Sequence, residues 1–182
     1  DSVKAGQIFI SIAPGKTLQW LGERLGENTK VIRTMPNTPA MVGEGMTALC
    51  VNELVTEEEI ALAVKLCDTF GKTEVIPEHL MDAVVGVSGS SPAYVFMFLE
   101  AMADAAVADG MPRAQAYKFA AQSVLGSAKL MLETGKHPGE LKDMVCSPAG
   151  TTIQAVRVLE EKGFRSAVIE AQTECVKKAK GM

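Results

Sequence analysis

The feature that most constrains the fold of this 182-residue chain is a change of pattern near residue 76. Before that point, short apolar runs that are typical of buried strands alternate with segments of helical apolar spacing. Such alternation favours an α/β layer with a largely parallel sheet. The predicted strands are Ile8–Ile12, Val31–Thr34, Thr47–Val51 and Thr73–Ile76, and the predicted helices run over Thr17–Leu25 and from the capping box at Thr56 to Gly71.

From Pro77 onward the sequence contains helical patterns alone. Ser91 followed by Pro92 predicts an N-cap with proline in the first helical position, and the helix should end at Asp109. Further helices are predicted over 113–133, after Pro138, after residue 150 and at the C-terminus. We therefore expect an α/β domain over residues 1–76 and an all-α domain over residues 77–182.

The first long helix of the second domain, residues 92–109, is apolar on nearly every face. A helix with so little polar surface must be covered by other protein, and its alanines allow close approach. A second copy of the chain could supply that cover, which predicts a homodimer. A central helix buried within one subunit is the alternative.

Composition excludes several classes of function. The formal net charge of -4 gives no basic patch for nucleic acid. Glycine, proline and charged residues interrupt the apolar runs, and no signal-peptide pattern opens the chain, so we expect a cytoplasmic protein with no membrane partner. The four cysteines are far apart and the two histidines lack ligand spacing, so the cysteines should be small buried residues and no metal site is predicted.

A loop of small residues, Ser147-Pro148-Ala149-Gly150, leads into a helix that should begin at Thr151. The first turn of a helix has backbone N–H groups without partners and lies at the positive end of the helix dipole, so it can bind a carboxylate or phosphate. Glycine and alanine let a ligand approach that backbone closely. An ordinary tight turn with a helix cap is the alternative interpretation.

Several segments resemble the pyrroline-5-carboxylate reductase family, in the family's order: residues 8–15, 35–39, 82–94, 137–143 and 142–156. The resemblance covers nearly the whole chain. It implies the C-terminal part of a Rossmann-type NAD(P)-binding domain, followed by an all-α dimerisation and substrate-binding domain. Ala149 stands where family members usually have the first glycine of Pro-Gly-Gly, a difference of one methyl group.

The family reduces the C=N bond of 1-pyrroline-5-carboxylate to give L-proline, the last step of proline biosynthesis, with NADP or NAD as cofactor. The resemblance implies that Thr152 is the catalytic residue, because its hydroxyl would hydrogen-bond the ring nitrogen. The implied substrate-binding residues are Glu78, Val145, Ser147, Gly150, Thr151 and Thr152. The implied cofactor-binding residues are Ile12, Ala13, Pro14, Asn37 and Glu78. The family also suggests rings of dimers.

Each of these roles has a structural alternative. Thr152 could satisfy the backbone of a helix N-terminal turn. Asn37 follows a predicted strand and could be a turn-forming asparagine, and Glu78 could be an exposed residue before a helix. Pro14 stands where the family often has alanine, which removes a backbone N–H donor.

The Gly-x-Gly-x-x-Gly turn that holds the pyrophosphate in Rossmann-type domains does not occur in this sequence. Gly43 and Gly45 lie instead in a short hairpin-like connection. The family's enzymes begin with that turn, whereas this sequence begins with Asp1. We therefore expect that the first half of the nucleotide-binding domain is missing, and that the chain alone binds NAD(P)H weakly or not at all. The choice between NADH and NADPH would be made in that missing half.

Two other functions remain open at this point. The chain could be a dimerisation fragment without catalysis, for the reason just given. It could also belong to another dehydrogenase with the same two-domain plan, such as a β-hydroxyacid dehydrogenase, which carries a catalytic lysine on the first helix of the helical domain. Residues 88–117 contain no lysine, and Arg113 is their only basic residue, which argues against that route.

Overall fold

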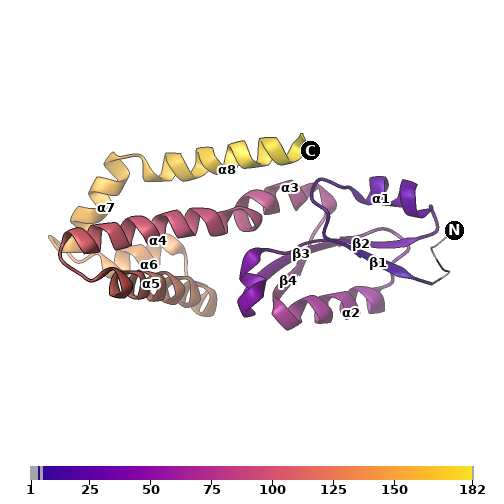
Figure 1. Cartoon of the computed structure of the whole chain (residues 1–182), viewed down its shortest axis with the longest axis horizontal. Coiled ribbons are helices and arrows are strands. Elements are labelled where there is room, and N and C mark those ends of the chain that lie inside the picture. Colours follow the sequence, from indigo (N-terminus) through magenta and orange to yellow (C-terminus); the bar gives the residue numbers. More distant parts are fainter. Residues whose placement is uncertain (1–3, 5, 182) are drawn as a thin grey trace. The chain divides into compact units, whose positions relative to one another are not determined.

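The computed structural model describes residue 4 and residues 6–181 (Figure 1). The chain forms two compact units, one of residues up to Pro92 together with those from Ala171 onward, the other of Ala93–Glu170. Two long helices cross from one unit to the other, so the units divide the chain differently from the predicted boundary between residues 76 and 77. That boundary stays a prediction.

The first unit contains a mixed four-stranded sheet in the order β1-β2-β3-β4. β1 pairs with β2 in parallel and β3 with β4 in parallel, whereas β2 and β3 are antiparallel. The expectation of a largely parallel sheet therefore holds for the two outer pairs only. The central pair is antiparallel because the connection between β2 and β3 is short and contains the 3-10 turn η1 (Thr38–Val42) instead of a crossover helix. The strands are β1 (Ile8–Ser11), β2 (Lys30–Met35), β3 (Gly45–Val51) and β4 (Gly71–Val75).

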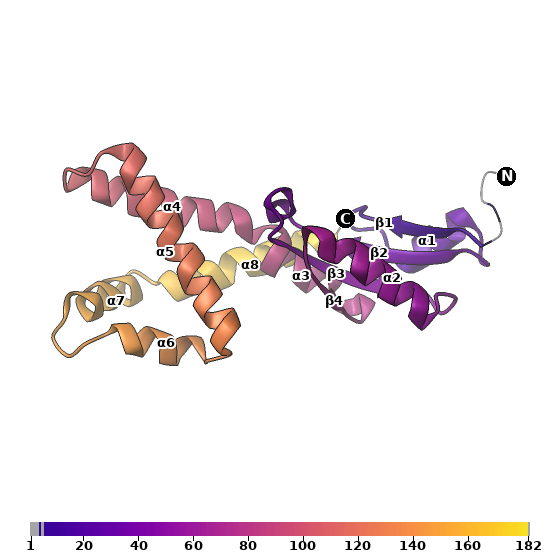
Figure 2. The same ribbon diagram turned by 90° about the horizontal axis from the view of Figure 1, so that it is seen from below.

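Helices cover both faces of this sheet, which confirms an α/β layer. α1 (Leu18–Leu25) and α3 (Met81–Val84) lie on one face and α2 (Glu57–Cys67) lies on the other, as Figure 1 and the view from below in Figure 2 show. Alternate residues of β2 point to opposite faces, so Ile32 packs in the α2 layer and Met35 in the α1 and α3 layer. These two apolar clusters are the core of the unit.

Threonine side chains cap the starts of α1 and α2. The Thr17 hydroxyl accepts a hydrogen bond from the backbone N–H of Trp20, at 3.0 Å, and caps α1. Thr56 and Glu59 form the predicted capping box at the start of α2, with both reciprocal hydrogen bonds present. The 3-10 turn η2 (Asp68–Phe70) then leads from α2 to β4.

After β4 the described chain is helical, and its first part is nearly continuous. The short turn η3 (Glu78–Leu80), α3, the π-helical turn η4 (Val85–Gly89) and α4 (Ser91–Ala108) follow one another directly. The predicted N-cap at Ser91 is therefore wrong. The backbone N–H of Ser90 bonds to the carbonyl of Val85, so the preceding turn passes into α4 without a break.

By length and composition, the helical stretch Glu78–Ala108 is apolar enough to cross a membrane. Its glycines and charged residues do interrupt the apolar sequence, but they are too few to lower the average far.

The second unit contains most of α4, the helices that follow it, and the first part of the last helix. α5 (Arg113–Thr134), α6 (Pro138–Val145), α7 (Thr151–Glu161) and α8 (Phe164–Lys180) follow α4, each close to its predicted place. On α4, Phe96 is 65% exposed and Met97 69% exposed. The helix is thus not buried within one subunit, and its apolar surface needs a cover that the described residues of a single chain do not supply.

Candidate functional site

The ends of four strands meet at one edge of the sheet. Because β3 and β4 run opposite to β1 and β2, this edge combines the carboxyl ends of β1 and β2 with the amino ends of β3 and β4. An open hollow of about 700 Å³ lies there, mostly lined by apolar groups. Its lining residues are Ile12, Pro36, Asn37, Thr38, Ala40, Met41, Phe70 and Gly89. Two predicted cofactor-binding residues, Ile12 and Asn37, are thus brought together.

The other two residues of the segment after β1 do not line this hollow. The backbone N–H of Ala13 donates to the hydroxyl of Ser11 at 3.3 Å, a turn that shapes the exit from the strand. Pro14 is exposed and has no N–H to donate. Their cofactor-binding role stays a prediction.

Asn37 has a clear structural role. Its side-chain oxygen accepts from the backbone N–H of Met46 at 2.8 Å, and its side-chain nitrogen donates to the carbonyl of Ser88 at 3.1 Å. The amide therefore joins the β2–β3 connection to the π-helical turn η4. Both ends of the side chain are used in this way, which supports the turn-forming interpretation, and contact with a cofactor stays a prediction.

Glu78 lies beside a buried arginine that the sequence analysis did not select. Its Oε1 accepts from the backbone N–H of Leu18, the first residue of α1, at 2.7 Å. The same oxygen accepts from Nη1 of Arg33 at 2.9 Å. The Arg33 side chain is only 4% exposed, whereas the Glu78 side chain is 31% exposed. The interpretation of Glu78 as a merely exposed residue is therefore wrong.

Arg33 and Glu78 line a second hollow, of about 330 Å³. Gly15 and Thr17, which directly follow the Ile12–Pro14 segment, are also in its wall. A sequence signal for Arg33 did exist. It is the one charged residue within the otherwise apolar and hydroxyl-bearing centre of β2, from Val31 to Met35. Such a residue is rarely buried without a partner.

Cys50 faces this ion pair from the neighbouring strand, since it is directly opposite Arg33 in the β2–β3 register. Burial and, to a smaller extent, the Glu78 carboxylate raise the pKa of the Cys50 thiol to about 11, although the Arg33 guanidinium acts in the opposite direction. The thiol is thus protonated at neutral pH. Cys50 and Cys67 are small buried residues, as predicted, whereas Cys146 and Cys175 are only half-buried.

In the second unit, the Ser147–Gly150 loop leads into α7 as predicted. The backbone N–H of Gly150 donates to the carbonyl of Ser147 at 3.0 Å and closes the turn. α7 then begins at Thr151 with no side-chain cap. Side chains do cap α1, α2 and α6, through Thr17, Thr56 and His137. The first-turn N–H groups of α7 are therefore available to a ligand.

The turn before α7 has one unusual backbone conformation, at Ala149, and one crowded position, at Gly150. Ala149 has a φ of 57°, and it is the only residue other than glycine with positive φ in the described part of the chain. A Cβ on Gly150 would collide with the Ser147 hydroxyl and lie 3.1 Å from the Ser147 carbonyl oxygen, so any other residue there would require the loop to shift. Within this group Thr152 is half-buried, whereas Ser147, Thr151 and Val145 are exposed. The structure thus gathers five predicted substrate-binding residues around one helix start.

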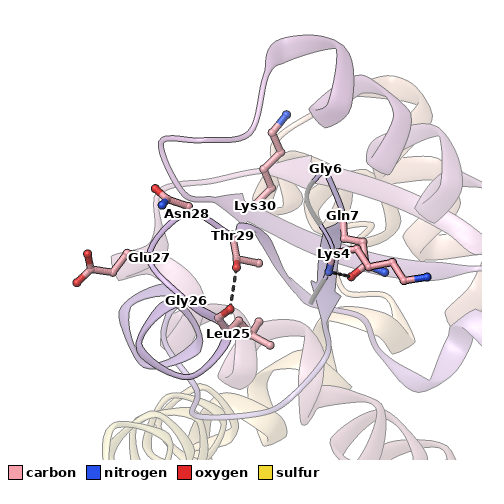
Figure 3. Close-up of a pocket in the computed structure, with 9 residues that line it drawn as sticks. All are labelled: Lys4, Gly6, Gln7, Leu25, Gly26, Glu27, Asn28, Thr29 and Lys30. Atoms are coloured by element: carbon pink, nitrogen blue, oxygen red, sulfur yellow. Dashed lines mark hydrogen bonds between the residues drawn. The ribbon is translucent and has the colours of Figure 1, made fainter. Parts of the chain in front are cut away.

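A third hollow lies at the opposite edge of the sheet, beside the amino ends of β1 and β2, and contains no predicted site residue (Figure 3). Its wall is held by local bonds. The Thr29 hydroxyl donates to the carbonyl of Leu25 at 2.9 Å, and the Gln7 side chain accepts from the backbone N–H of Lys4 at 2.8 Å. These bonds account for the wall as loop and helix-end structure.

Comparison with known proteins supports the family suggested by the motifs. A family model described as pyrroline-5-carboxylate reductase dimerisation matches residues 78–182. A pyrroline-5-carboxylate reductase of Escherichia coli (strain K12) is 64% identical over 179 residues, which are 98% of this chain and 66% of that protein. The chain thus spans just under two thirds of the length of this relative.

Two solved structures have a similar fold. A 1-pyrroline-5-carboxylate reductase from Streptococcus pyogenes matches with a TM-score of 0.91 and 39% identity, over 97% of this chain and 68% of that one. A pyrroline carboxylate reductase from Plasmodium falciparum, solved with NADP bound, matches with a TM-score of 0.91 and 31% identity, over 97% of this chain and 71% of that one.

Proposed function

Because the chain belongs to the pyrroline-5-carboxylate reductase family, we propose that it takes part in the NAD(P)H-dependent reduction of 1-pyrroline-5-carboxylate to L-proline. The start of α7 is the observation that carries the proposal. It combines an uncapped helix N-terminus, a glycine without room for a side chain and two adjacent threonines. These are the groups that a small cyclic imine with a carboxylate requires.

The substrate carboxylate binds at the N-terminus of α7. The backbone N–H groups of the first turn and the hydroxyls of Ser147 and Thr151 supply donors, and the helix dipole favours the negative charge. Gly150 lets the carboxylate approach the backbone, and Val145 lines the same place. Anchored in this way, the ring is fixed in orientation, and fixed orientation can supply much of the rate of such a reaction.

Thr152 is the catalytic residue of the proposal. Its hydroxyl hydrogen-bonds the ring nitrogen and so holds the C=N bond in one orientation. Glu78 is the second residue of the proposal, because a carboxylate near an iminium favours the protonated, more electrophilic form. Thr152 thus binds and orients the ring, and Glu78 helps to keep the proton on the ring nitrogen.

The residues at the sheet edge fit part of a nicotinamide cofactor. The open, mostly apolar hollow beside Ile12 and Asn37 suits a flat ring. Ala13 and Pro14 directly follow Ile12 in the chain, and Glu78 lines the second hollow. When bound, NADH or NADPH supplies the hydride. The pyrophosphate, however, needs a glycine-rich turn after a strand, which these 182 residues do not contain. We therefore propose that the chain by itself binds the cofactor weakly.

The chain also self-associates through the apolar surface of its helical region. The exposed Phe96 and Met97 on α4 lie within the segment that matches the dimerisation family. Burying such side chains against a second copy removes apolar surface from water. A homodimer, and rings of such dimers, follow from the family resemblance. All four cysteines are free, which agrees with a reducing, cytoplasmic location.

The test compares two proteins: the 182-residue chain, and a chimera in which the residues of the E. coli relative that precede the matched region are placed before it. We expect NAD(P)H-dependent reduction of pyrroline-5-carboxylate by the chimera and little by the chain alone. Equal rates for both would overturn the argument about the missing turn. An inactive chimera that still forms dimers would favour a dimerisation module without catalysis.

Thr152→Val in the chimera isolates the proposed catalytic hydroxyl. Valine keeps the shape of the side chain but removes the hydrogen bond, so kcat should fall by about 10- to 100-fold while the oligomer persists. Thr134→Val is the matched control, because Thr134 lies exposed at the end of α5 and its hydroxyl bonds only to backbone groups nearby in the chain, the carbonyl of Leu130 and the N–H of Lys136. Wild-type kinetics in the Thr152 variant would remove this residue from the mechanism.

A further inference from the structure

The contacts of the Arg33–Glu78 ion pair do not make up for the loss of water around the buried guanidinium. A guanidinium that is 4% exposed has lost nearly all its water, yet its Nη1 donates one hydrogen bond, to Glu78, and its Nε is buried and has no hydrogen-bond partner among the described residues. A buried and incompletely satisfied ion pair is weak evidence for stability, because apolar residues of the same volume often serve as well. The burial of Arg33 therefore calls for a different reason.

The bonds of Glu78 suggest what that reason is. Both of its hydrogen bonds, from Leu18 and from Arg33, go to the same oxygen, Oε1. The second oxygen, Oε2, has no hydrogen-bond partner among the described residues, although Glu78 lines the second hollow. Two donors from two different elements, α1 and β2, thus fix the carboxylate and leave one oxygen for a ligand.

We propose that Arg33 is a positioning residue, which acts through Glu78 by holding Oε1 so that Oε2 is presented to the bound substrate or cofactor ribose. This inference rests on the proposed function, in which Glu78 contacts these ligands. It adds a role for the buried guanidinium, whose own atoms touch neither ligand. The same pair also fixes the start of α1, directly after the Ile12–Pro14 segment, because Leu18 donates to the shared oxygen.

The shared oxygen makes the roles of the two residues separable. Glu78→Gln can keep an acceptor at the place of Oε1 for Leu18 and Arg33, while an amide nitrogen replaces Oε2. Arg33→Met has the opposite effect, since it keeps the Glu78 carboxylate but removes the hydrogen bond from Arg33 to Oε1. A methionine fills the buried volume without a charge, and the half-exposed Glu78 remains solvated.

The experiment measures steady-state kinetics of the chimera described above, with pyrroline-5-carboxylate and NADPH, for wild type, both single variants and the double variant. We expect Arg33→Met to lower kcat/KM by about 10- to 100-fold, the size of loss that misplacement of a reacting group by about 1 Å produces. Glu78→Gln should give a similar loss. The double variant should lose no more than Glu78→Gln alone, because Arg33 acts only through this carboxylate.

Two controls separate positioning from a general loss of structure. Lys30→Met breaks another ion pair of β2, with Glu59 on the opposite face of the sheet, and should change kcat/KM by less than about twofold. The fluorescence of Trp20, the only tryptophan of this chain, reports whether α1 is still in place. In the Arg33 variant its emission should match that of the wild type.

The outcomes are distinct. A chimera without any reductase activity would refute the proposed function itself. An active chimera whose folded Arg33→Met variant retains wild-type kcat/KM would refute the role of Arg33, as would losses that multiply in the double variant. If Arg33→Met does not fold, Arg33→Lys decides. Its shorter, single-headed ammonium should give an intermediate kcat/KM, and a wild-type value would overturn the proposal.

Discussion

The residue whose replacement should stabilise this chain is Ala149, in the turn before α7. Its φ of 57° lies in the left-handed region, where the Cβ of an L-residue crowds the following carbonyl. Glycine has no Cβ and adopts this conformation freely. Ala149→Gly therefore removes one methyl group from a surface turn and with it the backbone strain of the loop.

The expected size follows from two opposing effects. Relief of the left-handed conformation should contribute roughly 1–2 kcal/mol to the free energy of unfolding. Glycine also makes the unfolded chain more flexible than alanine does, which costs about 0.4–1 kcal/mol. The midpoints of the two ranges differ by about 0.8 kcal/mol, which is the expected net stabilisation. For a chain of this length, that corresponds to a rise in Tm of about 1–4 °C.

The assay is urea unfolding followed by circular dichroism, at one fixed protein concentration because self-association is proposed for the chain. Ala155→Gly is the matched control. It is the same chemical change, six residues further on, at an exposed position within α7. There glycine should destabilise the chain by about 1 kcal/mol, since it lowers helix propensity.

Opposite signs for the two substitutions are thus the prediction. If Ala149→Gly lowered the unfolding midpoint as Ala155→Gly does, the strain at residue 149 would be absent in solution. The loop would then have a backbone conformation different from the one described, and the geometry proposed for the substrate carboxylate would have to be revised.

Two further predictions concern the first unit. Gly86→Ala should destabilise the chain by about 1–3 kcal/mol, because the new Cβ would lie 2.9 Å from two side-chain carbons of α8. The control is Gly22→Ala, whose Cβ enters open space within α1 and should stabilise the chain by about 0.5–1 kcal/mol. Equal effects of the two substitutions in urea unfolding would contradict this packing. The pKa of the Cys50 thiol is raised from an ordinary 9.0 to about 11, so the thiol stays protonated to a higher pH in the folded state than in the unfolded state. The contribution of the protonated Cys50 thiol to the free energy of unfolding is therefore complete below pH 9 and is lost as the pH rises through 11. Urea unfolding midpoints should fall more steeply over that range for the wild type than for Cys50→Ala. Parallel curves for the two proteins would refute this prediction.

The elements of this fold could be predicted largely from local sequence. The apolar periodicity of α1 and α2 and their threonine caps lie within a few residues, so the pattern and the structure agree closely. The direction of β3 could not be read in the same way. It depends on the conformation of residues 36–44, where a 3-10 turn and a left-handed Gly43 reverse the chain.

In the candidate site, too, some features could be predicted from local sequence and others could not. The loop before α7 was identified because glycine, alanine and two threonines are adjacent in sequence. The pairing of Arg33 with Glu78 joins residues 45 positions apart, and the link between Asn37 and Ser88 joins residues 51 apart. No local pattern encodes such pairs. They appear only when the sheet has placed β2 next to the segment that follows β4.

β1 has a consequence for how the chain behaves at high concentration. Among the described residues it pairs with β2 alone, so one side of its backbone has no strand beside it. Its side chains are largely apolar, and Ile10 is 42% exposed. An open, apolar strand of this kind is a template for strands of other molecules. Aggregation of the 182-residue chain should therefore proceed through β1, independently of the helical surface, and a segment that covers this edge should keep the protein in solution.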